Sequence, residues 1–120
     1  MKILIVDDEK DVQRLFEQRF RRERRNGLIE LHFAFSGEEA VNFLKAGGDS
    51  DLTLILSDIN MQKMNGLELL KIVREEYTNL KVYMLTAYGD DHYRQRAIEL
   101  GATDYLVKPI DFKFLKDLLM

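Results

Sequence analysis

The chain has no cysteine, no tryptophan and only one proline among its 120 residues. The absence of cysteine excludes disulfide bonds, thiolate catalysis, zinc–thiolate sites and iron–sulfur clusters. No apolar run approaches the roughly 20 residues that a membrane-spanning helix requires. Met1 and Lys2 lead directly into a strand-like segment rather than into a signal peptide, so we expect a cytoplasmic protein that does not contact the membrane.

The composition is that of one ordinary globular domain, with 46% hydrophobic and 32% charged residues. A chain of this length buries roughly two thirds of its unfolded surface and therefore folds without disulfide bonds. Its net charge of -3 gives no general attraction to nucleic acid. The arginine-rich run 19–25 suits the carboxyl end of a solvated helix, where cations interact favourably with the helix dipole. We expect no direct nucleic-acid binding.

Aliphatic runs alternate with longer segments of helical period, which indicates an α/β domain with a parallel sheet and crossover helices. Ser36 with Glu39, and Asn65 with Glu68, have the spacing of capping boxes at two helix starts. In the first helix we expect Val12, Leu15, Phe16 and Phe20 to form the inward stripe. The strands are expected near 2–6, 29–34, 52–57, 80–85 and 104–107, and the helices near 9–25, 37–46, 66–76, 91–100 and 112–119.

Four of the expected strands end in side chains that can do chemistry. In chain order these are Asp7 with Asp8, then Asp58, Thr86 and Lys108. Open parallel sheets bind ligands outside the carboxyl ends of their strands. The three carboxylates, the hydroxyl and the ammonium are therefore expected to share one edge of the sheet, and that edge is the predicted site.

Three ionised carboxylates at one edge repel each other unless a cation joins them. Asp7, Asp8 and Asp58 therefore predict a divalent metal, and oxygen ligands without histidine favour Mg²⁺, with Mn²⁺ as the other possibility. Mg²⁺ held by few carboxylates commonly also binds a phosphoryl oxygen. Lys108 offers a positive charge and Thr86 a hydroxyl to such a group, and Asp58 is the natural nucleophile.

Together these motifs resemble the receiver domain of two-component response regulators of the chemotaxis-regulator type. The resemblance covers essentially the whole chain, residues 1–120, as one receiver domain. It implies a flavodoxin-like fold of five βα units, a doubly wound parallel sheet with strand order 2-1-3-4-5. The motifs that carry it are Asp7-Asp8; Asp58 with Met61, Met64 and Gly66 after it; Thr86-Ala87; Gly101 to Tyr105; and Lys108-Pro109.

The resemblance also implies a role for each site residue. Asp58 would accept the phosphoryl group and Lys108 would contact it. Asp8 would bind Mg²⁺ directly, Asp7 through water, Asp58 as a further ligand, and Asn60 through its main-chain carbonyl. A cis peptide bond is implied at Lys108-Pro109, because proline makes that conformation accessible.

The implied switch pair is Thr86 and Tyr105. When Thr86 turns towards the phosphoryl group, Tyr105 would fill the vacated space and alter the face made by the expected helix 91–100, the last strand and the expected helix 112–119. The implied partner is a sensor histidine kinase or a phosphotransfer protein, and that face would also be a possible homodimer contact. Apart from slow self-dephosphorylation, the domain is not expected to be an enzyme.

Two other functions compete with this interpretation. One is a Mg²⁺-dependent phosphohydrolase of similar topology, although the first strand ends in adjacent aspartates rather than in the Asp-x-Asp pair of haloacid-dehalogenase-like enzymes. The other is a binding module that does not respond to phosphorylation, which the complete set of chemical groups disfavours.

One position departs from the family pattern, because Gln62 follows Met61 where such domains usually carry proline. We expect this change to loosen the loop after Asp58 and to affect rates rather than the reaction. Asn60 and Tyr88 are expected to flank the path of water to the phosphoryl group, with the Tyr88 ring shielding phospho-Asp58 from hydrolysis.

Overall fold

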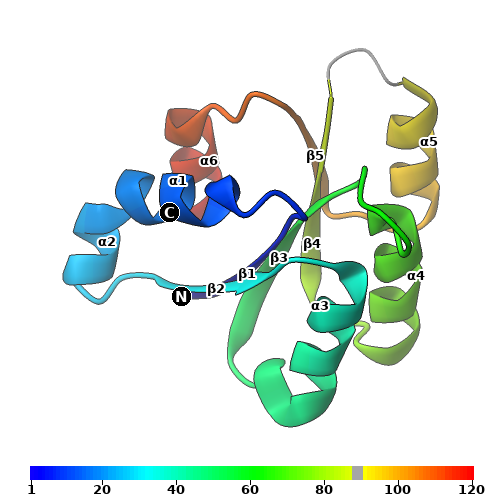
Figure 1. Cartoon of the computed structure of the whole chain (residues 1–120), viewed down its shortest axis with the longest axis horizontal. Helices are drawn as coiled ribbons and strands as arrows, with labels where there is room; N and C mark the ends of the chain where they lie inside the picture. The colour runs from blue at the N-terminus through cyan, green and yellow to red at the C-terminus, as the bar shows by residue number, and fades with distance from the viewer. Residues whose placement is uncertain (88–90) are drawn as a thin grey trace.

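The computed structural model describes residues 1–87 and 91–120, and in this part of the chain five parallel strands form one sheet in the order β2-β1-β3-β4-β5. Because all five strands run in the same direction, their carboxyl ends meet at one edge (Figure 1). The predicted fold class and strand order are confirmed. The strands are β1 (Lys2–Val6), β2 (Glu30–Ala34), β3 (Leu52–Asp58), β4 (Lys81–Thr86) and β5 (Asp104–Val107).

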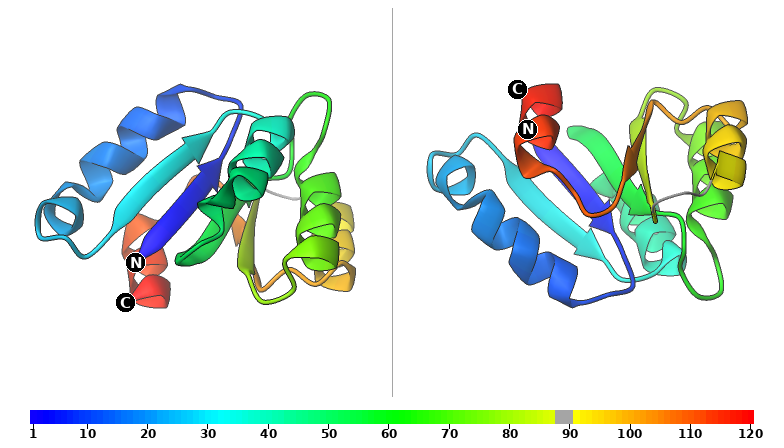
Figure 2. Two further views of the ribbon diagram at one scale, coloured as in Figure 1. Left: turned by 90° about the horizontal axis from the view of Figure 1, so that it is seen from below. Right: turned by 90° about the horizontal axis from the view of Figure 1, so that it is seen from above.

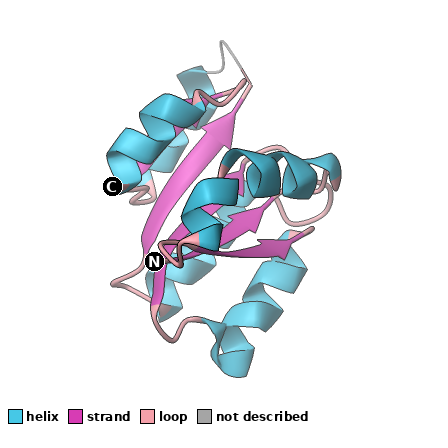
Figure 3. Cartoon of the chain, turned by 90° about the vertical axis from the view of Figure 1, so that its left-hand side faces the viewer, coloured by secondary structure: helices cyan, strands magenta, loops and turns pink. Residues whose placement is uncertain are grey.

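Helices cover both faces of the sheet, as expected for βα crossover connections (Figures 2 and 3). One face carries α1 and α6, and the other carries α3, α4 and α5 (Figure 1). Among the described helices, none has the length and apolar character needed to span a membrane. The helical elements are α1 (Asp11–Arg19), α2 (Arg21–Arg25), α3 (Gly37–Phe43), the π-helical turn η1 (Leu44–Gly48), α4 (Gly66–Glu76), α5 (Asp91–Glu99) and α6 (Phe112–Leu119).

The central strands are buried on both sides, which explains why they read as continuous apolar runs. Along each strand, successive side chains enter opposite cores. In β1, for example, Ile3 and Ile5 pack towards α1 and α6, whereas Leu4 and Val6 pack towards α3 and α4. The same alternation determines to which face of the sheet the side chain of each strand-end residue points.

The expected single helix over 9–25 is wrong, because the chain bends at Phe20 and forms two helices. Phe20 is 1% exposed and its ring packs against those of Phe16 and Phe112, so its position is set by the core. The five residues of α2 include no apolar side chain that needs burial. The expected inward stripe is also wrong at Leu15, which is 38% exposed.

The two predicted capping boxes differ in the structure. At Asn65 the box is complete, since Asn65 accepts from the Glu68 N–H and Glu68 accepts from the Asn65 N–H. At Ser36 only half of it forms: the hydroxyl accepts from the Glu39 N–H, but the Glu39 carboxylate accepts from the N–H of Phe35 instead of Ser36. The start of α4, which follows the loop after Asp58, is therefore held from both sides.

Candidate functional site

Two neighbouring strands bring the three aspartates together. Val6 of β1 pairs with Ser57 of β3, so Asp7 and Asp58, the next residue on each strand, stand side by side at the carboxyl edge. One carboxylate oxygen from each of Asp7, Asp8 and Asp58 lies within 4.8 Å of the others. Asp7 and Asp58 are buried, whereas Asp8 is exposed. The three acidic side chains therefore lie together, as the sequence predicts.

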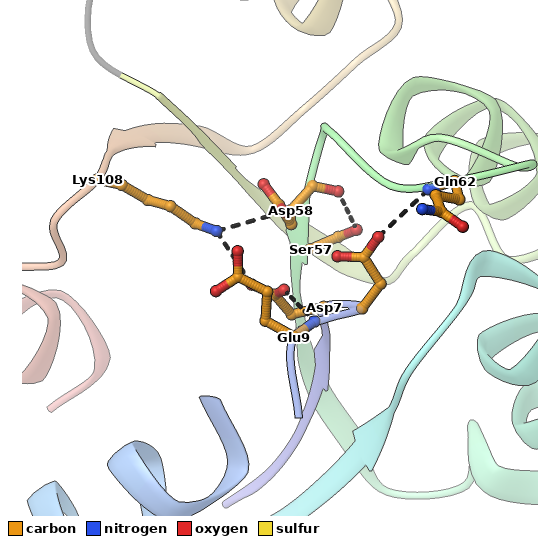
Figure 4. A network of polar contacts seen from close by, with 7 residues as sticks. Asp7, Glu9, Ser57, Asp58, Gln62 and Lys108 are labelled. Atoms are coloured by element: carbon orange, nitrogen blue, oxygen red, sulfur yellow. Dashed lines mark hydrogen bonds and ion pairs between the residues drawn. The ribbon is translucent and has the colours of Figure 1, made fainter. Parts of the chain in front are cut away.

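Lys108 directly follows the edge strand β5, and its side chain reaches the acidic cluster from there (Figure 4). Its Nζ lies 3.1 Å from Oδ2 of Asp7 and 3.3 Å from Oδ2 of Asp58. Its backbone N–H donates to the Thr86 carbonyl, which ties the start of the β5–α6 loop to the end of β4. The Lys108-Pro109 peptide bond is cis, as the resemblance implies. A single ammonium therefore bridges two buried carboxylates that repel each other.

Burial dominates the electrostatics of Asp58. Its pKa is raised to about 6 from 3.8 as the net result of several effects. Loss of solvation is the largest and raises the pKa, Lys108 and the backbone of Asn60 lower it, and the neighbouring Asp7 charge raises it. Burial lowers the pKa of Lys108, but the charges of Asp58 and Asp7 outweigh it, so the net shift is upward. Near neutral pH, Asp58 is therefore mainly ionised yet more basic than an ordinary aspartate.

The donor set of the cluster suits a hard divalent cation. Three carboxylates supply only oxygen atoms, and one ammonium cannot neutralise all three. Oxygen ligands of this kind fit Mg²⁺ or Mn²⁺. Asn60 lies on the adjoining loop, with its backbone hydrogen-bonded to Asp58. The proposed use of the Asn60 carbonyl as a ligand stays a prediction.

Thr86 and Tyr105 lie on neighbouring strands but outside the hydrogen-bonded cluster. In the register of β4 and β5, Tyr105 pairs with Met84, two residues before Thr86 on the same strand. Side chains two residues apart on a strand point to the same face. The side chains of Thr86 and Tyr105 therefore both lie on the face that α3, α4 and α5 cover. Thr86 is fully buried, and within the described residues its Oγ1 has no hydrogen-bond partner. The Arg94 guanidinium lies 5.8 Å from the centroid of the half-buried Tyr105 ring. Their switch role stays a prediction.

Sequence reasoning missed two backbone donors to the acids. The Glu9 N–H donates to Oδ1 of Asp7 at 2.9 Å, and the Gln62 N–H approaches Oδ2 of Asp8 at 3.3 Å (Figure 4). Gln62 was expected only to loosen its loop, yet it contributes an amide proton that proline lacks. Glutamine in place of the usual proline at position 62 was the sequence feature that could have revealed this donor. Tyr88, the expected shield, lies outside the described residues.

Comparison with known proteins places these features in a family. The family model for the response regulator receiver domain matches residues 3–120. The chain is 38% identical over 109 residues to the DNA-binding transcriptional regulator NtrC of Proteus hauseri, covering 91% of this chain and 22% of that protein. It is 34% identical over 121 residues to the chemotaxis protein CheY homolog of Campylobacter jejuni, covering 99% of this chain and 89% of that protein.

A solved structure agrees with the sequence comparisons. The response regulator receiver protein from Pseudomonas putida superposes with a TM-score of 0.86 at 25% identity, covering 98% of this chain and 93% of that one. The chain spans about a fifth of NtrC, so the activity of that whole regulator is not carried over. With the family model spanning nearly all residues, and the fold and acidic edge described above, the chain belongs to the response regulator receiver domain family of two-component systems.

Proposed function

We propose that residues 1–120 act as one receiver domain that takes a phosphoryl group onto Asp58 from the phosphohistidine of a sensor kinase or of a phosphotransfer protein. The observation that carries this proposal is the setting of Asp58. Its carboxylate is buried at the carboxyl edge of the sheet, within reach of two further acids and of Lys108. Receiver domains are generally phosphorylated by histidine kinases, and a cytoplasmic location is part of the proposal.

In the proposed reaction an ionised oxygen of Asp58 attacks phosphorus. The bond between phosphorus and the donor imidazole nitrogen breaks, its electron pair stays on that nitrogen, and the aspartyl acyl phosphate forms. A pKa of about 6 keeps most of Asp58 ionised near neutral pH while preserving more basicity than an ordinary aspartate has. Lys108, already 3.3 Å from Asp58, holds positive charge where the phosphoryl oxygens gather negative charge.

The acidic cluster would hold Mg²⁺ through Asp8, Asp58 and the main-chain carbonyl of Asn60, with Asp7 acting through water. When bound, the ion would neutralise the charge that collects between the carboxylates and the phosphoryl oxygens. The three carboxylates supply the hard oxygen ligands that Mg²⁺ requires. Their negative charge exceeds the positive charge of the single lysine, which favours binding of a cation.

The proposed output begins at Thr86. Its buried hydroxyl, which has no hydrogen-bond partner within the described residues, is available to donate to a phosphoryl oxygen on Asp58. Movement of Thr86 would change the space next to Tyr105 on the neighbouring strand, and through it the face formed by α5, β5 and α6. We propose that this face contacts the downstream partner or a second copy of the chain.

Receiver domains are generally not enzymes, and here we propose only slow hydrolysis of the phosphorylated Asp58 as a reset. This separates the proposal from its two rivals. A phosphohydrolase would release phosphate from a small phosphodonor through many turnovers, and a binding module insensitive to phosphorylation would not react at all.

Incubation with acetyl phosphate and Mg²⁺, followed by intact-mass analysis, tests the proposal. One phosphoryl group should be added to the wild type and to Asp117→Asn, which removes an exposed aspartate of α6. Asp58→Asn should remain unmodified. Equal labelling of Asp58→Asn would show that another residue is the acceptor, and rapid repeated turnover of acetyl phosphate would favour the phosphohydrolase.

A further inference from the structure

Each carboxylate of the acidic cluster has a polar partner, and the two buried carboxylates share Lys108. Asp7 accepts from the Glu9 N–H and from Lys108, and Asp58 is paired with Lys108. Asp8 is different because it is exposed and its partner comes from a distant part of the sequence. Within the described residues, that partner is the backbone N–H of Gln62, 3.3 Å from Oδ2 and 54 positions along the chain.

The loop that presents this N–H is closely packed at both ends. Met64 lies against Gly37, where a Cβ atom would come within 2.7 Å of the methionine sulfur. Gly66 lies against the carbonyl oxygen of Asp58, where a Cβ atom would come within 2.2 Å, and its N–H donates to the Ile59 carbonyl at 2.9 Å. The loop is thereby closed on its own first residues and docked on the start of α3.

Within the loop, Lys63 adopts a left-handed conformation with φ of 60°. This region is strained for a residue with a Cβ atom, so the shape must be held by its surroundings. The turn at Lys63 directly follows Gln62, and the tight contacts of Met64 and Gly66 lie just beyond it. The position of the Gln62 N–H is therefore decided by the loop rather than by the glutamine side chain, which is exposed.

We infer that the backbone N–H of Gln62 is a positioning group for Asp8. It would hold Oδ2 and leave the other oxygen of the carboxylate free to bind the cation, and this inference rests on the proposed function. Carboxylates that bind metals are commonly oriented by a second hydrogen bond, and loss of such a partner weakens metal affinity about 10- to 100-fold. At this position every amino acid except proline supplies the donor.

The inference also links the loop to the metal. If the hydrogen bond from Gln62 to Asp8 strengthens cation binding, then cation binding must strengthen that hydrogen bond by the same free energy, because coupling between two interactions is reciprocal. Cation binding should therefore reduce the motion of residues 59–65, which connect Asp58 to the start of α4. The glutamine is expected to tighten the link between this loop and the acidic cluster.

Replacing the amide of residue 62 by an ester tests the inference, because the ester removes one proton donor and keeps the chain connectivity. The matched pair is Gln62→Ala, which keeps the N–H, and the same protein with lactic acid, the hydroxy-acid analogue of alanine, at position 62. Mg²⁺ affinity is measured for both by calorimetry. We expect Gln62→Ala to bind as the wild type does and the ester to bind about tenfold more weakly.

Two further measurements separate positioning from a general effect on the fold. In Asp8→Ala, the ester should cause no further loss of affinity, because the group that it positions is gone. In NMR spectra of the metal-free protein, the chemical shift of the Gln62 amide proton should differ between the wild type and Asp8→Ala. This difference reports the loss of the hydrogen bond. Thermal unfolding of the matched pair checks that both fold.

The outcomes are distinguishable. If the wild type binds Mg²⁺ through Asp8 and the ester binds equally well or more tightly, the positioning role is overturned and the proposed function stands. The positioning role is also overturned if the ester weakens binding equally in Asp8→Ala. If Asp8→Ala and the wild type bind Mg²⁺ equally, the role of Asp8 in the proposed function is wrong, and the positioning role is overturned with it.

Discussion

Replacing Asp58 by asparagine should stabilise the metal-free protein, although it removes the proposed phosphorylation site. Burial raises the pKa of Asp58 to about 6 from 3.8. A carboxyl group whose pKa is higher in the folded state binds protons more strongly when folded, so its ionisation favours unfolding as the pH rises from about 4 to about 6. Above this range the full cost of ionising the buried group is present, and asparagine removes it.

The size of the effect follows from the shift itself. A pKa difference of roughly two units corresponds to ~3 kcal/mol, because each unit is worth about 1.4 kcal/mol. This is an upper value, since asparagine replaces the carboxyl group imperfectly. At about pH 4.5, where folded Asp58 is mostly protonated, the same pKa values leave a difference of only ~1 kcal/mol. The signature is therefore a stabilisation that shrinks in acid.

Urea denaturation in EDTA, followed by circular dichroism, measures this at both pH values. With a urea dependence of about 2 kcal/mol per M, the midpoint should rise by about 1.5 M at neutral pH. Asp117→Asn, which removes an exposed carboxylate, should change stability by less than about 0.5 kcal/mol. Equal or lower stability of Asp58→Asn at neutral pH, or a gain that does not shrink in acid, would refute the reasoning. Added Mg²⁺ should reduce the gain by stabilising the wild type.

Two other substitutions test the surroundings of the site by the same denaturation assay. Thr86→Val should stabilise the protein by about 1 kcal/mol, because it replaces a buried hydroxyl that lacks a hydrogen-bond partner within the described residues; a loss of more than about 1 kcal/mol would contradict this. Gly66→Ala should destabilise the protein by about 1 to 3 kcal/mol, because its Cβ atom would lie 2.2 Å from the Asp58 carbonyl oxygen. Wild-type stability of Gly66→Ala would show that the loop after Asp58 yields easily.

Most of the fold could be predicted from the sequence, because four of the five strands are short apolar runs that end at a distinct polar residue. The complete capping box of Asn65 and Glu68 was likewise readable, since both partners lie within one helical turn. The break at Phe20 was not readable. The helical spacing of apolar residues continues to Phe20, and the packing of its ring against the distant Phe112 is present only in the folded chain.

The composition of the candidate site was predictable, whereas its internal contacts were not. Asp7, Asp8, Asp58 and Lys108 each follow an apolar run, so their meeting at one edge follows from the parallel sheet. The contact between Gln62 and Asp8 depends on the left-handed turn at Lys63 and on the contacts that hold the loop. No sequence motif in the chain predicts these features.

The sequence by itself determined which chemical groups this protein has and the edge at which they gather. Strand direction and hydrophobic alternation act locally, so they can be read one segment at a time. Only the tertiary structure decided how those groups affect each other: that one lysine bridges Asp7 and Asp58, that burial raises the pKa of Asp58, and that the Thr86 hydroxyl is enclosed without a partner among the described residues. Solvation and charge depend on all neighbours in space, and neighbours 50 or more positions apart meet only when the chain is folded.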